Sequence, residues 1–364
     1  MLLNKIISFL EKEVPLSLQE PYDNCGLQTG DINQEIQSAL ITVDITEQVI
    51  DEAIETKSDL IISHHPLIFQ GIKSVTGKNY TEKIIIKAIK NSIAIYSLHT
   101  NLDNIQNGVN FKIAEKLDLK NCRILLPSKD HFVKLSVFVP EKHAEIVRNS
   151  LFSSGGGHIG NYDCCSFNTF GEGSFRGSDI TNPYVGKKNQ LHFEKEIKIE
   201  TIVHKHLLNN LLKNMIDTHP YEEVAYDIYP LNNPDFNSGS GLIGELEKAE
   251  TEKTFLQLLK IKFNIHCIKH TNFTKRKIKK VALCGGSGSF LLSEAIKSKA
   301  DIFISSDFKY HQFFDTENKI LIADIGHYES EQFTKEIIYD LLIKKFANFA
   351  LRLSKINTNP INYF

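Results

Sequence analysis

The chain has 364 residues, of which 41% are hydrophobic and 24% are charged, and its formal net charge at pH 7 is −2. This composition is typical of a globular protein, and the length predicts two or three domains. The near-neutral charge argues against a broad nucleic-acid-binding face, and no apolar segment is long enough to span a bilayer. Six cysteines without a CxxC pair, and an N-terminal segment without a signal-peptide core, favour a cytoplasmic protein.

The first third of the chain alternates apolar runs with amphipathic runs. The apolar runs predict strands and the amphipathic runs predict helices. The predicted strands are Ser38–Asp44, Asp59–Ser63 and Ile93–Leu98, and the predicted helices are Thr46–Lys57, Glu82–Lys90 and Asn107–Leu117. Buried strands separated by helices indicate a parallel sheet, in which ligands bind at the carboxyl ends of the strands.

The last third repeats this alternation. Its predicted strands are Ile278–Leu283, Asp301–Ile304 and Ile320–Ile325, and its predicted helices are Ser289–Lys299 and a long one from about Tyr328 into the 340s. The loop Gly285-Gly286-Ser287-Gly288 joins a strand to a helix. Backbone N–H groups in such a loop can cradle a phosphate, but a tight turn explains the glycines equally simply.

The middle third differs from both ends. We predict strands at Lys134–Val139 and Phe193–Val203, a helix at His206–Thr218, and a Gly-, Asn- and Phe-rich loop or hairpin-like region at Ser154–Gly186. This order favours a small α+β module within a larger α/β domain. The predicted domains are therefore residues 1–127 together with 238–364, and an insert of residues 128–237, with linkers at Pro127–Asp130 and Asn232–Ser240.

Five side chains at predicted strand ends form a candidate metal site. His64 and His65 follow one strand, and Asp103 lies shortly after another. His327 follows a third strand, and Glu331 lies four residues later, which is one turn along a helix. If His64 and His65 are considered alone, two surface histidines in a loop are a sufficient explanation without a metal. A helix dipole would likewise account for the acidic Glu331 near a helix N-terminus, but it would not account for His327.

This mixed nitrogen and oxygen donor set suits two divalent ions of zinc, manganese, iron, cobalt or nickel, and it suits calcium poorly. Five ligands exceed what one closed zinc site takes, and two metals about 3.5–4 Å apart are typical of hydrolytic centres. His311 and His99 are candidate acid/base groups. The candidates for outer contacts to the ligands are Asp23, Asn24, Asp44 and Asp307.

Several segments resemble the GTP cyclohydrolase 1 type 2 family, also called the Nif-three-like dinuclear metal-centre proteins. They are EPYDNCGLQTG (20–30), DLIISHHPLIF (59–69), YSLHTNLD (96–103), LCGGSGSF (283–290) and DIGHYESE (324–331). The stretches GGGHIGNYDCCSF (155–167) and THPYEEVAYDI (218–228) are similar to the insert of longer bacterial members, which resembles the ferredoxin-like PII and CutA modules. Ser305-Ser306-Asp307 replaces the family's frequent Thr-Gly-Asp.

The resemblance implies a Nif-three-like outer domain and a homohexamer whose metal sites face an internal cavity. It also implies that His65 and Asp103 hold one ion, that His64 and His327 hold the other, and that Glu331 bridges them. The expected activity is metal-dependent hydrolysis of a small molecule, such as a nucleotide, by metal-bound hydroxide.

The alternative is a non-catalytic regulatory hexamer with an insert that senses a ligand or a partner. A weaker alternative is nucleic-acid binding in the cavity of the ring. Within the insert, His158, His219 and Glu222 could form a small polar site, or they could simply satisfy backbone groups.

Overall fold

The computed structural model describes residues 1–364 and divides the chain into two compact units. Unit 1 comprises Met1–Pro127 and Phe236–Phe364, and unit 2 comprises Ser128–Asp235. Both ends of the chain therefore belong to one unit. No helix combines the length and the apolar character that crossing a membrane requires.

Unit 1 contains two sheets, and the first is mostly parallel. Its strands, in spatial order, are β1 (Gly26–Thr29), β4 (Ala94–Ser97), β3 (Leu60–Ser63), β2 (Ser38–Thr42) and β15 (Ala350–Leu353). β15, β2, β3 and β4 pair in parallel, and β1 pairs with β4 antiparallel. Every residue of β2, β3 and β4 is buried, as expected of parallel strands covered on both faces.

The second sheet of unit 1 is mixed. Its strands, in spatial order, are β11 (Lys269–His270), β14 (Leu321–Asp324), β13 (Ile302–Ser306), β12 (Lys277–Ser287), β10 (Asp235–Thr251) and β5 (Lys120–Ser128). β12, β13 and β14 pair in parallel. The carboxyl ends of these three strands therefore meet at one edge of the sheet.

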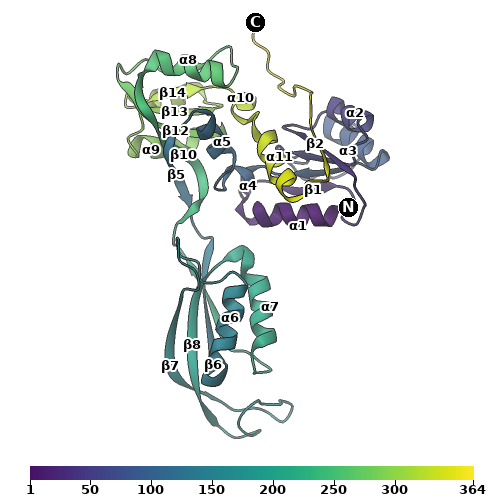
Figure 1. The fold of residues 1–364 in the computed structure, drawn as a ribbon, viewed down its shortest axis with the longest axis vertical. Helices are drawn as coiled ribbons and strands as arrows, with labels where there is room; N and C mark the ends of the chain where they lie inside the picture. Colours follow the sequence, from purple (N-terminus) through teal and green to yellow (C-terminus); the bar gives the residue numbers. More distant parts are fainter. The chain divides into compact units, whose positions relative to one another are not determined.

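Helices cover both sheets of unit 1 (Figure 1). They are α1 (Leu3–Glu13), α2 (Glu47–Glu55), α3 (Tyr80–Lys90), α4 (Thr100–Asp103), α5 (Val109–Lys116), α8 (Glu252–Lys262), α9 (Leu292–Lys297), α10 (His327–Glu331) and α11 (Thr334–Lys345), with 3-10 turns at Leu16–Leu18, Ser289–Leu291 and Tyr310–Thr316. Thr46 and Asn79 cap α2 and α3, because each side chain accepts a hydrogen bond from a first-turn backbone N–H group.

The inner faces of the two sheets share one hydrophobic core. Ile41 and Ile62 of the first sheet and Leu283 and Ile304 of the second belong to it, together with apolar side chains of α1, α5, α8 and α11. A second core lies between the first sheet and the helices α2 and α3, and a third joins the second sheet to α9. The shared core brings the carboxyl ends of strands from both sheets to one region.

Unit 2 is one antiparallel sheet with two helices on a single face. Its elements, in chain order, are β6 (Phe132–Pro140), a 3-10 turn (Glu141–His143), α6 (Ala144–Ser153), β7 (Ser166–Phe175), β8 (His192–His204), a 3-10 turn (Lys205–Leu207), α7 (Leu208–Thr218) and β9 (Tyr226–Leu231). The spatial strand order is β7-β8-β6-β9. Alternate residues of β6 and β8, such as Val137 and Ile199, pack on Leu151 of α6 and Met215 of α7.

Three local predictions differ from the structure. The Gly- and Phe-rich region contains the ten-residue strand β7, because pairing with β8 overrides its weak strand propensity. The predicted exit linker lies partly in β10, where Gly239 adopts a positive φ of 147°. The predicted long C-terminal helix is divided into α10 and α11.

Candidate metal centre

Six side chains of unit 1 converge from the two sheets. His64 and His65 follow the carboxyl end of β3, and His99 and Asp103 follow that of β4. His327 and Glu331 lie at the two ends of α10, directly after β14. Their ligand atoms form three overlapping groups in which all atoms lie within 4.8 Å of one another. The sheet edges thus bring together residues that are up to 267 positions apart in the sequence.

The first group contains His65, His327 and Glu331. Glu331 Oε2 lies 3.0 Å from His65 Nε2 and 3.1 Å from His327 Nε2. The two Nε2 atoms are 3.2 Å apart. His327 reaches Glu331 because the two residues are four apart on α10, as the sequence pattern predicts.

The second group contains His64, Asp103 and Glu331. His64 Nε2 lies 3.7 Å from Asp103 Oδ1 and 3.7 Å from Glu331 Oε1. The two oxygens of Glu331 therefore belong to different groups. This geometry groups His65 with His327 and His64 with Asp103, whereas the family resemblance implies the opposite pairing. The reason is local, because the side chains of adjacent residues at the end of a strand are directed to different sides.

An outer ring of acceptors holds the histidines. The Nδ1 atoms of His65 and His327 lie 2.7 Å from Asp44 Oδ1 and 2.6 Å from Asp307 Oδ2. The His64 Nδ1 atom lies 2.9 Å from the Leu98 carbonyl oxygen. An acceptor at Nδ1 fixes the tautomer that leaves Nε2 free as a ligand, and it orients the ring.

His99 is held in the same way. Its Nδ1 lies 2.8 Å from Asp23 Oδ1, and Asp23 also accepts hydrogen bonds from the backbone N–H and the hydroxyl of Thr100. His99 forms the third group with His64 and His65, and its ring centroid is 5.3 Å from those of both. His99 therefore resembles the other three histidines in that its Nδ1 atom faces an acceptor. This geometry suits either a metal ligand or a proton-transfer group.

The electrostatics of the cluster centre on Glu331. Burial alone would raise the pKa of Glu331, but the surrounding histidines hold it well below its usual range. Burial alone would lower the pKa of His65 and of His327, but hydrogen bonds to carboxylates raise these pKa values to about 10 and about 9. Burial and the charge of Glu331 raise the pKa of Asp103 well above its usual range. The buried carboxylate therefore favours protonation of His65 and His327 in the metal-free chain, and these histidines favour the ionised form of Glu331.

Two buried atoms of the cluster, His64 Nε2 and Asp103 Oδ1, lie 3.7 Å apart and have no hydrogen-bond partner. Buried polar atoms are rarely left unpaired without a functional reason. Neighbouring ligands of one zinc-sized ion lie about 3.0–3.6 Å apart, which follows from metal–ligand bonds of about 2.0–2.2 Å. The separations of 3.0 and 3.1 Å in the first group lie in this range, and those of 3.7 Å in the second group are only slightly longer, so the donor atoms fit divalent metal ions.

The Gly-rich loop at the end of β12 lies directly against Glu331. A Cβ atom on Gly286 would lie 2.1 Å from Glu331 Oε1, and Gly286 has a φ of +59°. The N–H groups of Gly285, Gly286 and Gly288 donate to side chains of Asn110, Ser330 and Ser305. These N–H groups are thus already used within the chain, which supports the tight-turn interpretation over a phosphate cradle.

A cavity of about 200 Å³ adjoins the cluster. Asp103, His99, His327 and Glu331 contribute to its wall, and Tyr22 and Phe290 supply aromatic surface. Tyr22 is 65% exposed and Phe290 is 60% exposed, so both rings are accessible from solvent. The cavity gives a small molecule access to the cluster.

Two sequence candidates lie apart from the cluster. His311 is exposed, and its ring contacts those of Tyr310 and Phe314. Asn24 donates its side-chain amide to the Ile68 carbonyl oxygen at 2.6 Å rather than to a histidine, although its backbone N–H donates to Asp23. The structure therefore places neither side chain against the six convergent residues.

Sequence reasoning missed several supporting residues. The Thr358 hydroxyl donates to Asp44 Oδ2 at 2.6 Å, and the Asn110 amide donates to the Asp103 carbonyl oxygen at 3.0 Å. Gly286 and the cavity residues Tyr22 and Phe290 were also missed as site residues. Of these residues, only Tyr22, Gly286 and Phe290 lie in sequence motifs that could have indicated a role at the site. Thr358 is 314 residues from its partner, so no local pattern could have identified it.

The fold and the site define an α/β protein with a His- and carboxylate-rich cluster between two sheets. A model of the family Duf34/NIF3 (NGG1p interacting factor 3) matches residues 1–360. The chain therefore belongs to the Duf34/NIF3 family.

Relatives of similar length support this assignment. A Halalkalibacterium halodurans protein named GTP cyclohydrolase 1 type 2 homolog is 39% identical over 363 residues, which cover 98% of each chain. A Bacillus subtilis protein of the same name is 36% identical over 366 residues, covering 99% of this chain and 98% of the relative. The crystal structure of a Bacillus cereus protein related to NIF3 matches with a TM-score of 0.84 at 36% identity, covering 100% of this chain and 99% of the other.

Proposed function

We propose that this chain binds two divalent transition-metal ions and hydrolyses a nucleotide or a related small molecule. The observation that carries the proposal is the convergence of histidine and carboxylate atoms within 4.8 Å of one another, among which the buried His64 Nε2 and Asp103 Oδ1 have no hydrogen-bond partner. The proposed ligands are His64, His65, Asp103, His327 and Glu331, and zinc, manganese, iron, cobalt and nickel all suit this donor set. Such ions, when bound, supply Lewis acidity and lower the pKa of water at the site.

The side chains around the ligands would keep the site ready for binding. Glu331 has one oxygen beside each group, so its carboxylate would help to hold ions at both of them. Asp44 and Asp307 hold the rings of His65 and His327 through Nδ1. The ligands are thereby oriented before an ion arrives, which reduces the entropy that binding must overcome.

His99 is the better-placed of the two candidate proton-transfer groups. It lines the cavity beside the cluster, and Asp23 orients its ring through Nδ1. Its Nε2 is therefore available either to a substrate or to an ion. His311 is exposed and contacts only neighbouring rings of its own 3-10 turn, so the geometry gives it no support in this role.

The test is product analysis with metal-loaded protein. Zinc-, manganese- or iron-loaded protein would be offered a nucleotide panel that includes GTP, with Asp103→Asn as the inactive control, and products would be identified by mass spectrometry. Turnover that depends on both metal and Asp103 is the expected result. Formate release from GTP would identify cyclohydrolase chemistry, and phosphate or nucleoside release would identify another hydrolase. Absence of metal-dependent turnover of every nucleotide would contradict the proposal.

A second candidate function is a regulatory metal protein whose insert senses a ligand. It is favoured by the separate hydrophobic core of unit 2 and by a cavity of about 400 Å³ within that unit. The β-α-β-β-α-β order supports a ferredoxin-like, PII/CutA-like insert. Deletion of residues 128–230 should then remove a ligand response but leave bound metal unchanged. Loss of all metal on deletion would count against a separable module.

We also propose a homohexameric assembly, as the family resemblance implies. Multi-angle light scattering of the full chain would give about six times the mass of 41.4 kDa if this is correct. A monomeric or dimeric mass at all concentrations tested would contradict it.

A further inference from the structure

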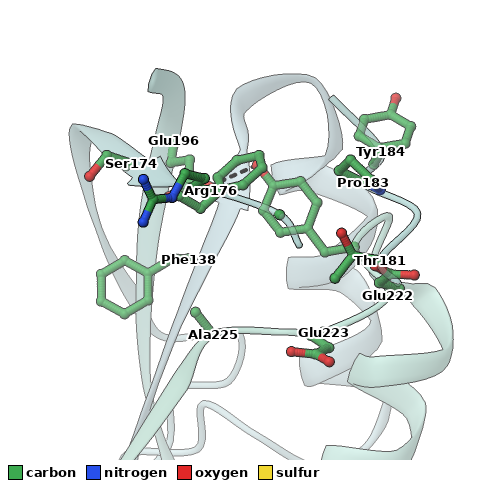
Figure 2. A pocket seen from close by; sticks show the side chains of 14 residues that line it. Phe138, Ser174, Arg176, Thr181, Pro183, Tyr184, Glu196, Glu222, Glu223 and Ala225 are labelled. Carbon is green, nitrogen blue, oxygen red and sulfur yellow. Dashed lines mark hydrogen bonds between the residues drawn. The ribbon is translucent and has the colours of Figure 1, made fainter. Parts of the chain in front are cut away.

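The cavity of unit 2 lies at one end of its sheet and uses none of the residues of the metal centre. Phe138 of β6, Phe175 of β7 and Glu196 of β8 line it, together with Tyr184, Tyr221 and Glu222 from the loops. Figure 2 shows Phe138 and Glu196 on one side of the cavity, with Tyr184 and Glu222 across from them. Phe138 and Glu196 belong to the sheet face opposite the helices, because their neighbours in sequence face the core.

Aromatic rings form much of the wall. The ring centroid of Tyr221 is 5.9 Å from that of Phe175 and 6.3 Å from that of Tyr184. The hydroxyl of Tyr184 lies 2.8 Å from His143 Nε2, which fixes the outermost of these rings. Several aromatic faces around one space are typical of sites for organic cations, since each face carries negative electrostatic potential.

The carboxylate of Glu196 is held in place at this wall. Tyr221 donates its hydroxyl to Glu196 Oε1 at 2.8 Å, and burial together with the charge of Glu196 raises the pKa of Tyr221, so the hydroxyl stays protonated. A Cβ atom on Gly173 would lie 2.2 Å from Glu196 Oε2, so the glycine leaves room for the carboxylate. The neighbouring acids of β8, Glu194 and Glu200, pair with His192 and Lys198, whereas Glu196 pairs with a neutral phenol.

The charge of the lining is negative overall. Glu196, Glu222 and Glu223 line the cavity, and Arg176 is the one basic side chain that does so. Glu222 accepts a hydrogen bond from the backbone N–H of Asn182 at 2.7 Å, which ties the loop after β7 to the cavity. No imidazole or thiol lines the cavity, so the donors that transition metals prefer are missing from its wall.

We propose that this cavity binds a small organic cation, namely an alkylammonium or alkylguanidinium group with a short apolar stem. The head group would lie against the aromatic faces and pair with Glu196, and the stem would contact Phe138 and Phe175. This site is independent of the proposed metal chemistry, because all of its residues belong to unit 2.

The test compares four probes with the same four-carbon stem, which are butylguanidinium, butylammonium, 1-butanol and butyrate. Binding to the full chain would be measured by saturation-transfer NMR titration. Both cations should bind saturably, and butanol should bind at least about tenfold more weakly because it lacks the charge–carboxylate and cation–π interactions. Butanol binding as tightly as the cations, tighter binding of butyrate, or no saturable cation binding up to about 10 mM would each overturn the proposal.

Matched variants locate the site. Glu196→Gln should weaken cation binding about tenfold, whereas Glu200→Gln, on the same strand and face but outside the lining, should leave it unchanged. Tyr184→Ala, at a ring that is 52% exposed and tolerant of truncation, should weaken binding about two- to fivefold even if the Glu196 variant folds poorly. Asp103→Asn in unit 1 should bind the cations as the unmodified chain does. Unchanged affinity in both Glu196→Gln and Tyr184→Ala would refute the assignment.

Discussion

Replacing Gly286 with alanine tests whether the close approach of β12 to Glu331 is required by the cluster. The new Cβ atom would lie 2.1 Å from Glu331 Oε1, a separation that no real contact allows, and it would sit on a residue with a φ of +59°. Glu331 is only 3% exposed, so its carboxylate cannot move into solvent without disturbing the core around it. Two costs therefore add at this position, one from backbone strain and one from the displaced carboxylate.

The two costs can be separated by a control in the same unit. Gly77 also has a positive φ, of +79°, but its Cβ would make only an ordinary contact, at 3.5 Å from Ile86. Gly77→Ala should therefore cost about 1–2 kcal/mol of unfolding free energy from the left-handed backbone alone. Gly286→Ala should cost about 3–5 kcal/mol more, the usual penalty for separating a buried charge from its partners.

The assay is denaturant unfolding of metal-free protein, followed by circular dichroism, with bound metal measured separately by plasma mass spectrometry after gel filtration. Gly286→Ala should lose most of its bound metal, and Gly77→Ala should retain it. Equal unfolding free energies for the two variants, with equal metal contents, would refute the argument that the glycine is needed by Glu331.

Three further predictions concern the same cluster. Asp44→Asn should weaken metal binding about 10–100-fold in competition with a chelator, because the His65 ring loses its charged partner; unchanged affinity would contradict this role. Asp103→Asn should lower the metal content from two ions to one, because Asp103 belongs to one of the two groups that contain Glu331. Glu331→Gln should reduce the occupancy of both ions, because Glu331 belongs to both of these groups. Equal losses of metal in the two variants would argue against this grouping. The pKa values of His65 and His327 rise from 6.5 to about 10 and about 9, so their protons stabilise the metal-free fold below pH 6.5, and this contribution is lost as pH rises through 9 and 10. The melting temperature of metal-free protein should therefore fall over that window, while metal affinity rises because bound ions displace the same protons; a melting temperature that rises with pH would contradict the sign.

Local sequence patterns were sufficient to place the strand ends that carry the convergent side chains. The apolar runs before His64 and before His327 correspond to β3 and β14, and no predicted end of these strands differs from the observed end by more than one residue. The i, i+4 spacing predicted that His327 and Glu331 would share one face of a helix, and their side chains are 3.1 Å apart. Such features depend on backbone periodicity over a few residues, which a single sequence reveals directly.

Other features depended on partners that are distant in the sequence. The strand β7 could not be recognised from its glycines and exposed residues, because its conformation comes from pairing with β8. The pairing of His65 with His327 rather than with Asp103 follows from the directions in which neighbouring residues leave β3 and from the position of α10. The contact between Thr358 and Asp44 and the approach of Gly286 to Glu331 arise in the same way.

The sequence by itself thus determined which residues stand at strand ends and which chemistry their side chains can perform. The tertiary structure alone decided which of them meet, because the shared core sets how the two sheets of unit 1 face each other. That core is non-local, and close packing fixes its geometry to within fractions of an ångström. Local propensity carries no information on that scale, so the grouping of the convergent side chains is a property of the folded chain.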